Sequence, residues 1–329
     1  MFLRFFRSSF FSQYLAIILA GLLLWGRAFF VPPMMPVATG PVPLYKLLYL
    51  LLSGLPLLAV FLGYLLNLAS AFYLNFLLTR HEILPKNSSL AAFLYLFLVS
   101  YYPVLLTLHP VNICLFILLF VLEQIFASYS RKDPLGLAYS AGLLVAIGAM
   151  FYFPFIFFYL FILVAFIVFR TSSMREWISS FIGIFTPYLF LIVYYFWFDL
   201  ARFKILEFGH SFIPHFTLEP FRDTGLLIFT MLQFILLLFG VFAGLARISD
   251  RTIEIRRKTI LLIWLAVFLI LSAPFAGPLI SYHLLISFIA VSALLSLYFL
   301  RLKNTFWQEL LLMTLIILVL IHNLFPFFT

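Results

Sequence analysis

The sequence predicts an all-α fold, a polytopic transmembrane helix bundle of about 11 helices, within a range of about 10–12. Apolar residues make up 66% of its 329 residues and charged residues only 9%. A globular domain in water has about 45–50% apolar residues and about 25% charged residues. Apolar residues also run almost without interruption through stretches such as 47–78 and 135–169. This excludes a membrane β-barrel, whose strands alternate polar and apolar residues.

The expected helices are apolar runs, and most of the breaks between them have a physical cause. We expect helices at residues 13–31, 45–79, 88–108, 111–130, 135–152, 154–170, 177–198, 224–246, 258–275, 279–300 and 305–327. His109 ends one run because a residue before proline avoids the helical region. Pro154 suits the first turn of a new helix, so the long run is divided at Tyr152-Phe153-Pro154. Residues 1–329 are predicted to form a single transmembrane domain.

The run at residues 47–78 can be read in two ways. It contains no charged side chain, and as one helix it would be about 48 Å long at 1.5 Å per residue. That length exceeds one crossing and falls short of two. Because Gly54, Pro56 and Gly63 offer no polar turn, one long, kinked and tilted helix is the preferred interpretation.

The distribution of basic residues predicts the orientation. With the N-terminus inside, 15 of the 20 Lys and Arg residues fall in inner connections, as the positive-inside rule requires. The outer side keeps Arg27, Lys46, Arg202, Lys204 and Arg222. If the 47–78 run formed two crossings, Arg27 and Lys46 would replace Arg4 and Arg7 on the inner side, and the inner side would still hold 15 basic residues. The rule therefore fixes the orientation only after residue 80. We expect a multi-pass inner-membrane protein with a cytoplasmic N-terminus and an outside C-terminus.

Several kinds of partner are excluded by the residue pattern. The net charge of +9 is explained by inner loops, so no nucleic acid is expected. There is no P-loop, GxGxxG or GxSxG motif, which excludes nucleotides. The single Cys114 and the spacing of the six histidines fit no metal motif. We expect no metal and no cofactor, with the lipid bilayer as the principal partner.

The connection at residues 199–223 is the longest expected on the outer side, and loops of this length are often lids or binding loops. Phe203, Ile205, Leu206 and Phe208 suggest a short segment lying on the outer surface. The candidate catalytic residues of this loop are its four acids, Asp199, Glu207, Glu219 and Asp223. Its candidate binding residues are His210 and His215. The alternative is an ordinary solvated loop.

Two further candidate binding residues lie near the expected helices. Glu123 falls within an apolar run, where an ionisable group costs about 2.5–3.5 kcal/mol and is a functional candidate by default. Alternatively, Gln124 and loop bases such as Arg131 satisfy it near the interface. Arg27 lies at the outer end of the first helix and can extend towards the headgroups.

Short motifs connect the chain with a known family. They are Lys86-Asn87, Gly142, the run from Ala149 to Pro154, Arg170, Arg175-Glu176-Trp177-Ile178, Gly183 and Pro187-Tyr188. With the phenylalanine-rich N-terminus, they resemble an uncharacterised family of polytopic inner-membrane proteins of Bacteroidota. This resemblance implies an inner-membrane location and no particular activity.

A weaker likeness is to multispanning glycosyltransferases that use polyprenyl-phosphate sugars. Those enzymes place an acidic motif in the first outer loop, whereas residues 31–45 contain no acid here. In such a protein only the 199–223 loop would supply the carboxylates.

Three functions remain open from the sequence. The first is a non-catalytic scaffold or assembly component of an envelope pathway, whose partners are other membrane proteins. The second, nearly level with it, is glycosyltransferase-like handling of a polyprenyl-linked or lipid substrate at the outer leaflet. The third is a secondary transporter in which Glu123 relays protons, with Asn67 and Gln233 along the path. The scarcity of paired broken helices argues against the third.

Overall fold

The computed structural model is all-α, and no strand occurs among its described residues. It describes residues 5–6, 10–101, 106–129, 131, 133–169, 173–214, 224–245, 248, 251–301, 309, 312–313 and 316–317. Its helices are α2 (Phe11–Phe30), α3 (Pro43–Leu52), α4 (Pro56–Arg80), α5 (Leu90–Val99), α6 (Pro110–Ser128), α7 (Leu135–Phe151), α8 (Phe158–Phe169), α9 (Met174–Trp197), α10 (Ala201–His210), α11 (Thr224–Leu245), α12 (Ile253–Ser272), α13 (Ile280–His283) and α14 (Ser287–Arg301). The 3₁₀ turns among the described residues are η2 (Phe153–Phe157), η4 (Ala273–Phe275), η5 (Gly277–Leu279) and η6 (Leu284–Ile286).

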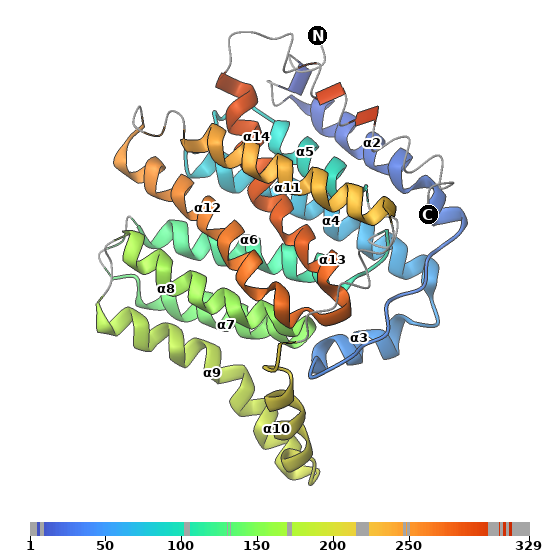
Figure 1. The fold of residues 1–329 in the computed structure, drawn as a ribbon, viewed down its shortest axis with the longest axis vertical. Coiled ribbons are helices and arrows are strands. Elements are labelled where there is room, and N and C mark those ends of the chain that lie inside the picture. The colour runs from blue at the N-terminus through green and yellow to red at the C-terminus, as the bar shows by residue number, and fades with distance from the viewer. Residues whose placement is uncertain are drawn as a thin grey trace.

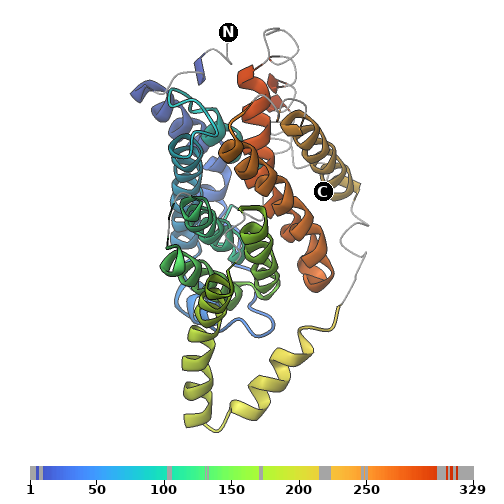
Figure 2. The same ribbon diagram turned by 90° about the vertical axis from the view of Figure 1, so that its left-hand side faces the viewer.

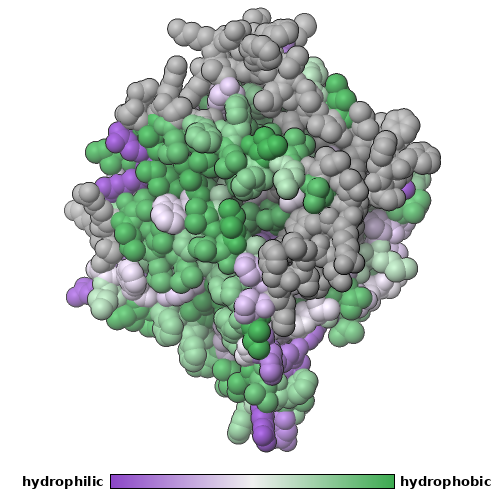
Figure 3. Space-filling view, viewed as in Figure 1, coloured by the Kyte–Doolittle hydropathy of each residue, from purple (hydrophilic) through white to green (hydrophobic). Residues whose placement is uncertain are grey.

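Five helical segments in the described part of the chain are long and apolar enough to cross a membrane. They are Phe11–Phe30, Pro56–Arg80, Pro110–Ser128, Met174–Trp197 and Ile253–Phe275. Shorter apolar helices pack among them (Figure 1). Apolar side chains cover much of the described surface in Figure 3, and hydrophilic ones gather towards its edges and its lower tip. Such a surface is stable only in contact with lipid, so this is a membrane protein.

The interpretation of residues 47–78 as one helix is wrong. The chain forms α3 and α4, with a break at Ser53, Gly54 and Leu55. Leu55 adopts φ −128° and ψ 65° because the residue before a proline is driven out of the helical region. Pro56 then opens α4. With ten residues, α3 is about 15 Å long and cannot cross the membrane.

Other boundaries follow the sequence more closely. The division at Tyr152-Phe153-Pro154 is confirmed, since α7 ends at Phe151 and Pro154 lies in the first turn of η2. The helix expected at 88–108 ends early, at Val99, and all ten residues of α5 are buried. Most of the helix expected at 305–327 lies outside the described residues.

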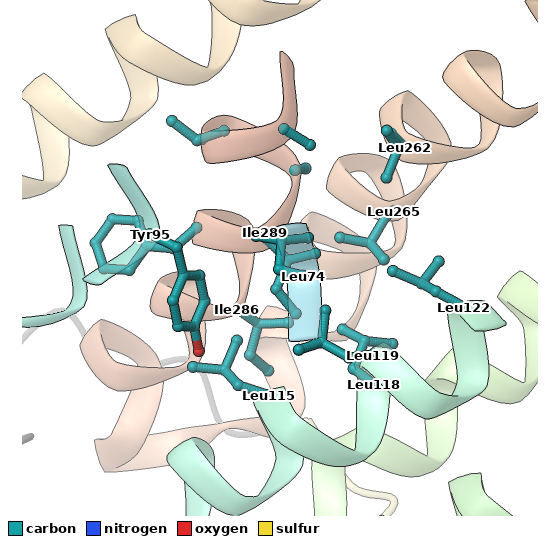
Figure 4. Packing of buried hydrophobic residues seen from close by; sticks show 14 of the residues in the cluster. Leu74, Tyr95, Leu115, Leu118, Leu119, Leu122, Leu262, Leu265, Ile286 and Ile289 are labelled. Atoms are coloured by element: carbon teal, nitrogen blue, oxygen red, sulfur yellow. The ribbon is translucent and has the colours of Figure 1, made fainter. Parts of the chain in front are cut away.

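The core lies where α4, α5, α6, α12 and α14 meet. Figure 4 shows Leu74, Leu118, Leu265 and Ile289 pointing towards one another from four of these helices. All four are fully or almost fully buried. The interdigitated leucines and isoleucines make a rigid body from which the two ends of the bundle project.

Two glycines set the position of α9 against α7. A Cβ on Gly183 would lie 2.1 Å from the carbonyl oxygen of Tyr139, and one on Gly142 would lie 2.1 Å from that of Ser180. Both neighbours are backbone atoms, so the two helices touch backbone to backbone. Small residues allow this close approach in membranes. Apart from Glu176, the other residues of α9 are exposed or half-buried, and the end of the helix projects below the bundle (Figure 2).

The connections form two groups at opposite ends of the bundle. One group, called here the basic end, comprises residues 80–83, 129, 131, 133–135, 169, 173–175 and 251–258. Within it, Arg251 Nη1 donates to the carbonyl of Ile83 at 2.9 Å, and Arg257 Nη1 to that of Phe169 at 3.1 Å. The other, called the aromatic end, comprises residues 31–45, 106–110, 152–157, 198–214 and 273–283. Its contacts include the rings of Phe157 and Phe275, 4.1 Å apart.

Candidate functional site

An apolar groove lies at the aromatic end between α9 and α10. After α9 the chain turns at Asp199, which has a left-handed φ of 55°, and α10 runs back towards the bundle (Figure 2). The groove has a volume of about 420 Å³. Its apolar walls come from four elements: Ile184, Phe185, Tyr188, Leu191 and Ile192 of α9, Ile205 and Phe208 of α10, Ile156 of η2, and Val42 and Pro43 at the start of α3.

Aromatic packing fixes the far end of α10 over this groove. The ring of Phe208 lies 5.5 Å from that of Phe153 and 5.3 Å from that of Tyr188. Phe212 adds a contact of 5.0 Å with Phe153. Edge-to-face pairs of this kind contribute about 0.5–1.5 kcal/mol each beyond their burial. The short surface segment expected from Phe203, Ile205, Leu206 and Phe208 is therefore α10, and it closes one side of the groove.

Two lysines and one glutamate form the rim of the groove. Lys46 Nζ lies 3.3 Å from Glu207 Oε1, and Lys204 Nζ lies 2.6 Å from Glu207 Oε2. Both lysines line the groove. Each ammonium thus pairs with a different oxygen of one carboxylate, and the three side chains keep a net charge of +1.

The environment of Glu207 makes it a poor base. Burial raises the pKa of its carboxyl, but the hydrogen bonds and charges of Lys204 and Lys46 outweigh this and hold the pKa below its usual range. A general base works best when its pKa is near the working pH. Glu207 is therefore suited to electrostatic pairing and unsuited to proton abstraction.

The other candidates from this loop are not gathered around Glu207. Asp199 is exposed in the turn before α10, and His210 is exposed at the opposite end of that helix. Glu219, Asp223 and His215 lie outside the described residues. Arg27 is exposed in the last turn of α2.

At the basic end, Glu123 is the centre of a charged network. Arg80 Nη1 lies 2.9 Å from its Oε1, and His81 Nε2 lies 3.2 Å from its Oε2. Lys258 Nζ lies 3.2 Å from His81 Nδ1 and also pairs with Glu254. Because an ammonium can only donate, His81 Nδ1 accepts from Lys258 and its Nε2–H donates to Glu123. The network thus joins α4, α6 and α12.

The partners of Glu123 differ from those expected. Gln124 and Arg131 were the alternative, whereas the structure supplies Arg80 and His81 at the end of α4. The Glu123 side chain is only 10% exposed. A buried carboxylate that pairs with a guanidinium and accepts a hydrogen bond from an imidazole has a sufficient structural explanation.

Two more histidines are buried at the aromatic end. Burial lowers the pKa of His109 to about 3 and that of His283 to about 4, so both rings are neutral at physiological pH. His109 Nδ1 accepts from the backbone N–H of Val111, and His283 Nε2 donates to the carbonyl of Leu269. Within the described residues no three potential ligands group to hold a metal ion.

Sequence reasoning did not select either lysine of the rim. Lys204 lies three residues before Glu207, and this helical spacing of opposite charges was a usable signal. Lys46 comes from α3, 161 residues away in the chain, and nothing local pointed to it. Lys258 was missed because α12 begins five residues earlier than expected, which makes it the helical partner of Glu254.

Among known proteins, the family of unknown function DUF6427 matches residues 80–328, which is more than half of the chain. The expected likeness to an uncharacterised family is confirmed at this level. The matched range contains α9, α10 and the Glu123 network, but not α3 with Lys46. No curated protein and no solved structure matches the chain.

Proposed function

The chain belongs to the DUF6427 family of unknown function, and we propose that it is a multi-pass inner-membrane protein that binds an anionic amphiphile at the outer leaflet. The observation that carries this proposal is the groove between α9 and α10, with apolar walls and two ammonium groups at its rim. An alkyl chain would lie along the walls, and the anionic head would lie at Lys46 and Lys204.

The size and position of the groove support this proposal. Small-molecule sites typically have volumes of about 300–1,000 Å³ and mostly apolar walls with a few polar groups, and this groove has about 420 Å³. Its wall on α9 belongs to a helix whose outer face is exposed along most of its length. A lipid could therefore enter sideways from the bilayer.

The chemistry of the rim supports binding and not catalysis. Glu207 is the carboxylate at the rim, and its lysine partners keep it ionised and weakly basic. A non-catalytic lipid-binding protein agrees with a role as an assembly component of an envelope pathway. The proposal therefore retains the lipid substrate of the glycosyltransferase-like alternative as a bound ligand, without its transfer reaction.

The outer-leaflet assignment rests on charge. Since α3 is too short to cross, the proposal takes α2 and α4 as the crossings before residue 80, so that the start of α2 lies on the side of the basic end. The positive-inside rule places that end in the cytoplasm.

We predict that Thr39→Cys will react with a membrane-impermeant maleimide in intact spheroplasts and that Arg175→Cys will react only after lysis. Both positions are exposed, at the aromatic and basic ends, and the native Cys114 is buried and should give little background. Labelling of Arg175→Cys alone in intact spheroplasts would reverse the orientation and reject the outer-leaflet assignment.

A second prediction tests the groove itself. Ile205→Trp should fill it and reduce the binding of dioleoyl phosphatidic acid about tenfold, because each alkyl CH₂ kept out of the groove forfeits about 0.8 kcal/mol. Binding is measured by native mass spectrometry of protein released from dodecyl maltoside. Ile213→Trp is the matched control, since Ile213 is exposed to a similar degree but does not line the groove. Equal lipid binding by the two variants would reject the proposed site.

A further inference from the structure

The Glu207 carboxylate occupies a position suited to an anionic head group. Each of its oxygens receives one lysine, from two helices that are far apart in the sequence. The two lysines line the groove together with apolar residues. Lysine ammonium groups act on phosphate and carboxylate alike as point charges, so a lipid phosphate would compete with Glu207 for the same partners.

We infer that Glu207 is an internal competitor that keeps bulk phosphodiester lipids out of the groove and admits lipids with a phosphate monoester head. The inference rests on the proposed function and names the class of lipid. Here Glu207 is a specificity-determining residue, because a head group binds only if its attraction to the two lysines exceeds that of Glu207.

A balance of charge separates the two lipid classes. A phosphodiester head carries one negative charge, so its binding at the lysines exchanges one unit charge for the unit charge of Glu207 and gains little. A phosphate monoester carries about −1.5 to −2 charges and three acceptor oxygens. It can therefore bind both ammonium groups more strongly than the Glu207 carboxylate does and displace it. Specificity obtained by penalising the wrong ligand is a common device in binding sites.

The burial of the rim strengthens this competition. The side chains of Lys204 and Glu207 are each 23% exposed, so solvent screens their pairing only in part. When a head group takes the lysines, Glu207 loses its partners while it remains mostly covered. A monoanionic head offers nothing to offset that loss.

Glu207→Gln tests the inference because it removes the competing charge and keeps the shape. We expect the wild type to bind dioleoyl phosphatidic acid at least about tenfold more tightly than dioleoyl phosphatidylglycerol, which has the same chains. In Glu207→Gln the affinity for phosphatidylglycerol should rise by about tenfold, since the charged hydrogen bonds between Glu207 and its two lysines no longer have to be displaced.

Asp199→Asn is the matched control. It makes the same change of charge on the same helical hairpin, at a left-handed φ of 55° that asparagine tolerates, and it should leave both affinities unchanged. Soluble glycerol 3-phosphate, which carries the monoester without chains, should not displace the lipid at equal concentration.

The results separate this inference from the proposed function. The inference is overturned if Glu207→Gln binds phosphatidylglycerol no better than the wild type, if it binds either lipid less well, or if the wild type binds both lipids equally. In those cases a loss of binding in Ile205→Trp would still support the groove. Lipid binding that is indifferent to Ile205→Trp rejects the groove and the inference together.

Discussion

Replacing Gly183 with leucine is expected to separate α9 from α7 and to abolish lipid binding in the groove. A Cβ at this position would lie 2.1 Å from the carbonyl oxygen of Tyr139 and 3.0 Å from the backbone nitrogen of Leu143. Backbone atoms of a packed helix cannot turn aside as a side chain can. The two helices must move apart, at a cost of about 3 kcal/mol or more at such an overpacked contact.

The loss should be large because α9 has few other attachments. Its buried residues are Glu176, Ser180 and Gly183, all in its first half, and its second half forms a wall of the groove. We expect a lower midpoint of thermal unfolding in dodecyl maltoside, together with loss of bound phosphatidic acid.

Gly136→Leu provides the control for this prediction. Gly136 is also in α7, but a Cβ there meets nothing within 4 Å, so the variant should unfold and bind lipid as the wild type does. If Gly183→Leu kept the wild-type midpoint and lipid binding, the close contact between α7 and α9 would not be what positions the groove.

These glycines show how far the sequence could predict the fold. Composition and apolar runs were sufficient to predict an all-α membrane protein, because the hydrophobicity of a helix depends only on the residues within it. Gly142 and Gly183 were noticed only as parts of a family resemblance. Their role depends on which helices meet, and no local pattern carries that information.

The break between α3 and α4 was missed for a related reason. Pro56 was a sufficient local signal to end a helix, but the long apolar run outweighed it in the interpretation. The groove depends on this break, because the start of α3 contributes Val42, Pro43 and Lys46 to it.

The candidate site was predictable only in part. The loop at 199–223 and the apolar segment within it were identified, and Glu207 was one of four acids given equal weight. What distinguishes Glu207 is its contact with Lys46 on another helix. The pairing of Glu123 with His81, and of His81 with Lys258, likewise depends on three helices that meet at the basic end.

The second large effect is expected from Glu123→Ala. The substitution removes the carboxylate that joins Arg80 and His81 at the end of α4 to α6, and it should lower the free energy of unfolding by about 1.5–3 kcal/mol, as the loss of a hydrogen bond to a charged group does. Glu123→Gln should cost less, because its amide oxygen can still accept the hydrogen bond from His81 Nε2–H. Thermal and denaturant unfolding in dodecyl maltoside measure both.

Double-mutant cycles should divide this energy unequally between the partners of Glu123. The Arg80 side chain is 57% exposed and that of His81 only 9%. Solvent weakens exposed ion pairs to below about 1 kcal/mol, so the coupling of Glu123 with His81 should exceed its coupling with Arg80. The opposite order would mean that the buried hydrogen bond does not hold the basic end together.

The same variants separate a structural network from a transport path. A structural network loses stability in Glu123→Gln, while the remaining folded protein still binds phosphatidic acid at the aromatic end with wild-type affinity. A relay instead requires that Glu123 exchange a proton, and the ammonium and guanidinium groups around it favour one charge state. Wild-type stability in both Glu123 variants, with altered lipid binding at the far end, would contradict the structural role and favour coupling between the two ends.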